Sequence, residues 1–145
     1  MRRATRDDVP ALVALLVDDA LGATREDPSD LTPYLAAFER VQASANTHLM
    51  VAELDGAVIG TLTLTVVPGL SRKGASRANV EAVRVASGMR SQGIGTHMME
   101  WAVTEATRLG CRRMQLTSDV TRLDAHRFYG RLGFDASHLG FMKVL

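Results

Sequence analysis

The chain has 145 residues, of which 46% are hydrophobic and 23% are charged, and its formal net charge at pH 7 is +1. This length and composition predict one compact globular domain across residues 1–145, with a hydrophobic core of its own. Because the charge is close to neutral, neither nucleic acid nor an anionic membrane is expected as an obligatory partner.

The cysteine content and the N-terminal sequence indicate the cellular compartment in which the protein is expected. The single cysteine, Cys111, excludes an internal disulfide framework and the usual cysteine-based zinc sites, so a reducing, cytoplasmic setting is expected. The first apolar run is broken by Asp18 and Asp19 and has no clear cleavage site, so no signal peptide is expected. No stretch of about 18 apolar residues is present, so no membrane-spanning helix is expected.

Apolar residues at helical spacing predict two helices in the first third of the chain. The first is expected across residues 7–22, with Thr5 or Asp7 as its N-cap and Gly22 at its end. The second is expected across residues 31–44, where the apolar side chains share one face. A polar, turn-rich segment between them indicates a surface loop.

The apolar period then changes to that of strands. Residues 48–54 and 57–67 are strand-like runs joined by Asp55 and Gly56, a dipeptide typical of tight hairpins because its turn requires positive φ. An antiparallel pair is therefore expected. Residues 78–86 return to strand character after a basic loop that contains proline and glycine.

The second half of the sequence alternates helices and strands. A long amphipathic helix is expected across residues 96–110, a strand across 111–118 and a short helix across 123–132. Closing strands are expected at 133–138 and 139–145. This order of elements predicts an α/β fold with a mixed sheet.

The stretch Arg-Ser-Gln-Gly-Ile-Gly, residues 90–95, places two glycines between a strand and a helix. A glycine inside a helix costs roughly 1 kcal/mol relative to alanine, so Gly93 and Gly95 indicate that something comes close to the backbone. The first N–H groups of a helix lack intrahelical partners and attract phosphate. A simpler interpretation is that Gly93 only relieves packing against the sheet. Neither the dinucleotide fingerprint nor the lysine of a P-loop is present, so the predicted ligand carries a phosphate of another kind.

This stretch resembles the (Q/R)-x-x-G-x-(G/A) signature of the GNAT superfamily, the acyl-CoA-dependent N-acyltransferases. It follows VEAVRVA as the signature follows the fourth strand of that family, and AHRFYGRLGF resembles the second conserved block of the family. The order of elements matches over essentially the whole chain. The resemblance implies a GNAT-like mixed, mostly antiparallel sheet flanked by helices, with splayed central strands. It also implies acetyl-CoA as the acyl donor.

The resemblance further implies where coenzyme A binds. In the family, the pyrophosphate lies on the amides of the glycine-containing turn, and the main chain of the fourth strand pairs with the pantetheine arm. The valines of that strand would be ordinary core residues at the same time. The implied contacts in this chain are Val83, Arg84, Val85, Arg90, Ser91, Gln92, Gly93, Ile94, Gly95, Thr96, His126 and Phe128.

Acyl transfer to an amine requires the neutral amine. Because a free alkylammonium has a pKa of about 10, a base or an ordered water is needed at neutral pH. Glu81 is the candidate base, since a glutamate near this position often acts through water in the family. Strand alternation places it on the same face as Val83 and Val85 unless a bulge intervenes. The alternative is a solvated or ion-paired strand residue.

The departing thiolate needs a proton or a hydrogen bond. Tyr129 matches the family tyrosine whose hydroxyl faces the sulfur of the coenzyme, so it is the candidate acid. Alternatively, Tyr129 is a core aromatic, because Ala125, Phe128 and Leu132 share its apolar helix face.

The expected function is N-acetyl transfer from acetyl-CoA to a primary amine of a small molecule or peptide, by direct attack. Acidic residues in the first two helices and the loop between them would suit a cationic amine, although such residues also serve solubility; they are Asp18, Asp19, Glu26, Asp27 and Asp30. A non-catalytic acyl-CoA-binding regulatory domain is the alternative. Family members are often dimers, so a homodimer stays open.

No metal is expected. The histidines have no ligand spacing among themselves or with Cys111, and each is expected to be a surface residue or to have its partners within the protein; they are His48, His97, His126 and His138.

Overall fold

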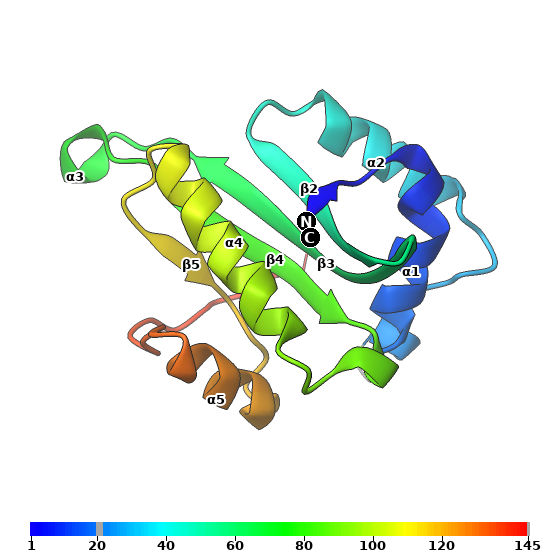
Figure 1. Ribbon diagram of the computed structural model, residues 1–145. Coiled ribbons are helices and arrows are strands. Elements are labelled where there is room, and N and C mark those ends of the chain that lie inside the picture. The colour runs from blue at the N-terminus through cyan, green and yellow to red at the C-terminus, as the bar shows by residue number, and fades with distance from the viewer. Residues whose placement is uncertain (20–21, 145) are drawn as a thin grey trace. The chain divides into compact units, whose positions relative to one another are not determined.

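The structure is a computed structural model that describes residues 1–19 and 22–144. By its internal contacts the chain forms a larger unit, Met1–Gln115, and a smaller unit, Leu116–Leu145 (Figure 1). The expectation of one domain stays a prediction. The predicted end of the first helix and the last residue of the predicted closing strand fall at residues 20, 21 and 145, outside the described residues.

The larger unit is built on a sheet with the strand order β1-β2-β3-β4-β5. The strands are β1 (Arg2–Arg3), β2 (Thr47–Leu54), β3 (Ala57–Val67), β4 (Arg77–Val85) and β5 (Met114–Leu116), whose last residue opens the smaller unit. Neighbouring strands from β1 to β4 are antiparallel. The mixed, mostly antiparallel sheet is thereby confirmed.

The predicted hairpin is confirmed. Asp55 and Gly56 have φ values of 50° and 80°, and the register of the two strands closes at Leu54 and Ala57. Strand β1 was not predicted, because its two residues are too few to show an apolar period. It pairs Arg2 with Val51 at the outer edge of the sheet.

Helices α1 (Val9–Val17), α2 (Thr32–Ala43), α4 (Ile94–Arg108) and, in the smaller unit, α5 (Leu123–Arg131) lie close to their predicted positions. The short α3 (Ser71–Gly74) was not predicted; it lies in the segment expected to be a basic loop, and Arg72 and Lys73 within it have φ values of 54° and 60°. Short 3-10 turns occupy Arg6–Asp8, Gly22–Thr24 and Ser87–Met89. Figure 1 shows α1 and α2 on one face of the sheet and α4 on the other. None of the helices in the described ranges is long and apolar enough to cross a bilayer.

The two faces of the sheet bury separate apolar layers. On one face, alternating residues of β3 and β4 meet the buried side of α4; these core residues include Leu62, Leu64, Val80, Met98, Met99 and Ala102. Gly60 permits the close approach of α4, since a Cβ there would lie 2.8 Å from the Met98 sulfur. On the other face, α1 and α2 cover Val51 with a cluster that includes Val9, Leu12, Val13 and Phe38.

A buried carboxylate joins the first strand to the first helix. Asp8 accepts hydrogen bonds from both ends of the Arg2 guanidinium, at 2.6 and 2.8 Å, and from the main-chain N–H of Thr5 at 2.7 Å. The Arg2 guanidinium and the Thr5 bonds hold the pKa of the Asp8 carboxyl well below its usual range. Thr5, one of the two predicted caps, forms a capping box with Asp8.

In the smaller unit the predicted helix is confirmed and the predicted closing strands are wrong. Residues 133–144 contain no strand. The apolar side chains of this segment are 85–96% exposed; they are Leu139, Phe141, Met142 and Val144. Their apolar character gives strand propensity, but a strand forms only where a second strand accepts its main-chain hydrogen bonds, and this segment pairs with no strand.

Candidate active site

The turn before α4 joins residues of positive φ to the first turn of a helix. Ser91 and Gly93 have φ values of 63° and 81°, and α4 begins at Ile94. The first hydrogen bond of the helix runs from the N–H of His97 to the carbonyl oxygen of Gly93 at 3.1 Å. The N–H groups that precede His97 therefore have no intrahelical carbonyl to bind. No acidic residue lies in the first turn of α4, so this turn suits a phosphate.

The Arg90 side chain holds this turn rather than pointing away from it. Its Nε donates to the carbonyl oxygen of Val85 at 3.0 Å, and its terminal nitrogen donates to that of Asp18 at 2.6 Å. The Asp18 carboxylate in turn accepts the N–H of Ser87 at 2.6 Å, and this bond lowers the pKa of Asp18. The end of α1 is thus tied to the turn that precedes α4.

A β-bulge interrupts β4 in front of this turn. The register passes from Glu81 opposite Thr63 to Arg84 opposite Thr61, so two residues of β4 face one of β3. Ala82, in the bulge, has a φ of 51°. The bulge shifts the alternation of side chains by one residue. Glu81 and Arg84 therefore lie on the α1 and α2 face, and Glu81 does not share a face with Val85.

On its outer side, the end of β4 has no partner strand among the described residues of the larger unit, although the carbonyl oxygens of Val83 and Val85 accept hydrogen bonds from the side chains of Arg84 and Arg90. The N–H of Ala86 bonds to Ile59 of β3 at 2.9 Å, so the main-chain groups of the preceding Val85 point away from β3. On that outer side, hydrogen bonds join Ser76 to Arg112 and Ala78 to Arg113, and they run in parallel order. These two bonds lie at the start of β4, which runs from Arg77 to Val85, and β5 is only three residues long.

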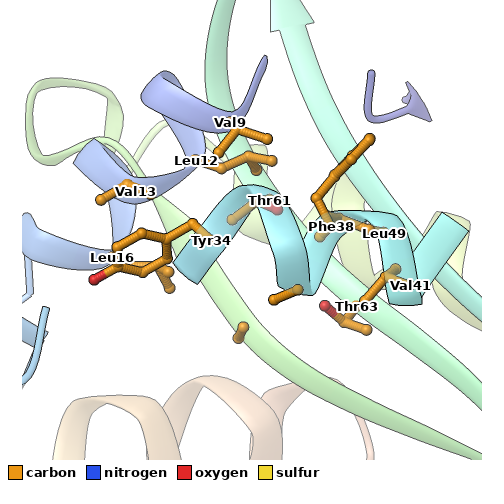
Figure 2. A pocket seen from close by; sticks show the side chains of 12 residues that line it. Val9, Leu12, Val13, Leu16, Tyr34, Phe38, Val41, Leu49, Thr61 and Thr63 are labelled. Atoms are coloured by element: carbon orange, nitrogen blue, oxygen red, sulfur yellow. The ribbon is translucent and has the colours of Figure 1, made fainter. Parts of the chain in front are cut away.

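A pocket of about 160 Å³ lies on the α1 and α2 face of the sheet (Figure 2). It is lined by Val9, Leu12, Val13, Leu16, Tyr34, Ala37, Phe38, Val41, Leu49, Thr61, Thr63 and Ala82. The pocket thus reaches the bulge of β4, one residue from Glu81, whose side chain is exposed. Sequence reasoning missed this pocket, because apolar helix faces predict a core and carry no signal of where that core is incomplete.

The acidic residues expected to receive a cationic amine are largely used by the protein itself. The Asp27 carboxylate accepts hydrogen bonds from Ser29, and the Asp30 carboxylate accepts the N–H of Thr32 at 2.9 Å; these bonds lower the pKa of both carboxyls. Glu26 accepts the Tyr34 hydroxyl at 2.9 Å.

Asp19, at the end of α1, forms an ion pair with Arg84 at 3.5 Å. Together with the bonds that Asp18 makes to the turn before α4, this shows that the acidic residues of α1 and the following loop support local structure.

The smaller unit carries the predicted acid. Tyr129 packs edge to face against Phe128, with ring centroids 5.1 Å apart, and against Phe134 at 5.9 Å. Its ring is half-buried, as are Ala125 and Leu132 on the same face of α5. His126, expected beside the coenzyme, places its Nε2 2.8 Å from the carbonyl oxygen of Asp119.

The remaining histidines have partners within the protein, as expected. The Nδ1 atoms of His48, His97 and His138 lie 2.7 Å from the Arg3 guanidinium, 3.0 Å from the Gly93 carbonyl oxygen and 2.8 Å from the Ser137 hydroxyl. Burial, together with the positive charge of Arg3, lowers the pKa of His48. In residues 1–19 and 22–144, no group of three His, Cys, Asp or Glu side chains is placed to hold a metal ion.

Comparison with known families identifies the family of this chain. The acetyltransferase (GNAT) family matches residues 10–134, which run from α1 to the residues after α5. The chain belongs to the GNAT family. Enzymes of this family use acetyl-CoA, and the turn before α4 fits its phosphates because the first N–H groups of the helix have no intrahelical carbonyl to bind and its first turn carries no negative side chain.

Relatives of the GNAT chain share its length and fold. It is 29% identical over 145 residues to an aminoalkylphosphonate N-acetyltransferase from Salmonella typhimurium, covering 100% of this chain and 90% of the relative. A solved structure from Bacillus halodurans C-125, described as a transcriptional regulator, is 40% identical with a TM-score of 0.96, over 99% and 97% of the two chains. A putative acetyltransferase from Agrobacterium tumefaciens is 25% identical with a TM-score of 0.89, over 99% and 98%.

Proposed function

We propose that this GNAT chain is an acetyl-CoA-dependent N-acetyltransferase that acts on the primary amine of a small molecule or peptide. The observation that carries the proposal is the order of three features along β4 and the segment that follows it. The pocket meets β4 at Ala82, the outer edge follows at Val83 to Val85, and the N–H-bearing turn follows at Ser91 to Gly93. An acceptor pocket, a site for an extended arm and a phosphate site thus succeed one another.

When bound, acetyl-CoA supplies an acetyl group activated as a thioester. The amides around Gly93, Ile94 and Gly95 hold its pyrophosphate, with Ser91, Gln92 and Thr96 beside them. The main chain of Val83 to Val85 pairs with the pantetheine arm as a further strand does. Arg84 and Arg90 contribute main-chain contacts, since both side chains bond within the protein. His126 and Phe128 remain proposed contacts from the smaller unit.

Two side chains handle protons. Glu81, directly or through a water, takes a proton from the acceptor ammonium and frees its lone pair. The nitrogen then attacks the carbonyl carbon, so that a C–N bond forms while the C–S bond breaks and its electron pair leaves on sulfur. As the amide forms, the nitrogen gives up its second proton to water, and the Tyr129 hydroxyl donates a proton to the sulfur and is restored from solvent. The products are the acetamide and free coenzyme A.

The 29% identical relative supports a small acceptor, since it is an aminoalkylphosphonate N-acetyltransferase. A panel of amines incubated with acetyl-CoA, with release of free thiol as the readout, tests the proposal. The panel includes aminoalkylphosphonates, simple alkylamines and arylalkylamines, amino acids, polyamines and peptide amino termini. We expect thiol release that depends on both the protein and the amine.

The second candidate function is a non-catalytic acyl-CoA-binding regulatory domain. It is favoured by the 40% identical structure described as a transcriptional regulator. Calorimetry with acetyl-CoA separates the two: binding of acetyl-CoA without thiol release for any amine of the panel would support the regulatory domain and contradict the enzyme.

A further inference from the structure

The lining of the pocket between α1, α2 and the sheet is almost wholly carbon. Among the described residues that line it, none is charged, and three carry a hydroxyl. Two of those hydroxyls are already used, since Tyr34 donates to Glu26 and Thr61 donates to the carbonyl oxygen of Met50, each at 2.9 Å. A charged or strongly polar guest would lose its hydration there without gaining partners. The lining therefore favours an apolar guest.

The size of the pocket restricts that guest. Its volume of about 160 Å³ is close to that of an apolar cavity of about 150 Å³ known to take up benzene. The pocket is open to solvent, because Ala82 at its edge is exposed and Ala37 and Val41 are half-buried. Figure 2 shows the lining side chains coming from both helices and from β3. One phenyl ring or a branched alkyl group of similar bulk fits.

The position of the pocket relates it to the reacting groups. Its edge residue Ala82 follows Glu81 in the chain, and Thr63, another lining residue, lies opposite Glu81 in the register of β3 and β4. Directly opposed residues of antiparallel strands have neighbouring side chains. A molecule whose apolar group enters the pocket at this edge keeps its polar end beside Glu81.

The surrounding charges do not favour a polycation. The carboxylates of Asp27 and Asp30 bind main-chain N–H groups of their own loop, and Asp19 pairs with Arg84. None of these three carboxylates belongs to the residues that line the pocket. Glu81 precedes the lining residue Ala82 in the chain and lies opposite the lining residue Thr63, so its carboxylate is placed to meet one ammonium group.

We infer that the pocket binds the side chain of the acceptor, and that the acceptor is a monoamine with one compact apolar group of about the size of a phenyl ring. The inference rests on the proposed acetyltransferase function and names its substrate class. An acceptor with a phosphonate in place of the apolar group does not suit the pocket, because no cationic side chain lines it to bind that anion.

The test compares kcat/KM for methylamine, isobutylamine, benzylamine and 2-aminoethylphosphonate with saturating acetyl-CoA, each corrected to the free-amine concentration. Burying an apolar group of this size is worth about 1.5–3 kcal/mol, so we expect benzylamine to exceed methylamine by about 10- to 100-fold. Isobutylamine should fall between them, and 2-aminoethylphosphonate should not exceed methylamine.

Two neighbouring alanines of α2 provide the matched variants. Ala37 lines the pocket, whereas Ala36 is exposed and does not. Ala37→Leu fills part of the pocket, so it should remove most of the advantage of benzylamine over methylamine, and Ala36→Leu should keep that advantage. If Ala37→Leu lowers the melting temperature sharply, Val41→Leu fills the pocket from the next turn of the helix and is measured in its place.

The outcomes separate the inference from the function it rests on. Thiol release at similar rates across the alkyl series, or a best rate with 2-aminoethylphosphonate, overturns the apolar subsite while the acetyltransferase stands. An advantage of benzylamine that Ala37→Leu and Val41→Leu both preserve also overturns it. Absence of thiol release with every amine removes the acetyltransferase, and the inference with it.

Discussion

At Tyr129 the ring and the hydroxyl have separable roles. Tyr129→Phe keeps the ring that packs against Phe128 and Phe134 and removes only the hydroxyl. If this hydroxyl protonates the departing thiolate, turnover should fall by roughly 10²-fold or more, the range expected for a positioned acid, while the affinity for coenzyme A changes little. Steady-state kinetics and calorimetry measure the two quantities.

The choice of acyl donor provides the control. A thioester whose thiol is more acidic needs less help to leave, so Tyr129→Phe should lose less rate with such a donor than with acetyl-CoA. The comparison is made where chemistry limits the rate. Turnover near that of the wild type would show that Tyr129 is a packing residue and that the proton comes from elsewhere.

Glu81 is exposed on a strand, so its substitution by Gln should leave the fold intact. Without a carboxylate, deprotonation of the acceptor depends on solvent. We expect Glu81→Gln to reduce kcat/KM most at low pH and to regain activity as the pH rises toward the pKa of the amine. Glu100→Gln, on the exposed side of α4, serves as the control and should keep the wild-type pH profile. Equal loss at every pH would indicate a positioning role for Glu81.

At the scale of elements, the proposed phosphate site at the N-terminus of α4 can be tested through the affinity for the coenzyme. Gly95→Glu places a carboxylate in the first turn, where the bound phosphates would repel it. We expect the dissociation constant for coenzyme A to rise about tenfold or more, with little change in the melting temperature. Val103→Glu introduces the same charge on an exposed site of α4, away from its N-terminus, and should bind normally. Unchanged affinity in Gly95→Glu would contradict the phosphate site.

The elements differ in how well their sequences predict them. Helix α4 and the hairpin at Asp55 and Gly56 were predictable, because each depends on contacts or turn geometry within a short stretch. The segment from residue 133 to 144 was not, since its apolar residues have strand propensity but strand formation depends on a neighbouring strand. The bulge at Ala82 also leaves no local signal, because alanine has no preference for positive φ.

At the scale of the whole molecule, the Asp8 carboxylate makes the stability of the fold depend on pH. Its pKa is lowered on folding, so its contribution to stability is complete above the unfolded-state pKa of about 4 and is lost as the pH falls below that value. We expect Asp8→Asn to lower the free energy of unfolding by about 2 kcal/mol at neutral pH, and this difference to shrink as the pH is lowered from 5 toward 2.

Denaturant unfolding at a series of pH values measures this difference. Asp7→Asn is the matched control, since Asp7 is an exposed neighbour in the same turn, and it should track the wild type. If the loss of unfolding free energy in Asp8→Asn stays constant down to pH 2, then the shape of the Asp8 side chain rather than its charge stabilises the contact with Arg2 and Thr5.

The candidate site was predictable to the extent that it lies in one stretch of chain. The turn at Gly93 follows from a motif of six residues, and Glu81 from its place in the strand before it. The pocket was not predictable, because its lining comes from α1, α2 and three strands and exists only when these meet. The role of Asp18 was also missed, since the sequence shows an acidic residue but not the distant N–H of Ser87 that it binds.

The bulge at Ala82 makes the length of β4 as important as its composition. Surface loops tolerate insertions and deletions, but here the number of residues sets which side chains face which layer. If Ala82 were a regular strand residue instead of part of a bulge, simple alternation would turn the guanidinium of Arg84 from the α1 side toward the apolar layer beneath α4. Deletion of Ala82 would instead keep Arg84 opposite Thr61 and remove only the bulge that borders the pocket. Among GNAT sequences compared by alignment, a gap placed at this position would thus mark a different pocket edge, even where every motif is retained.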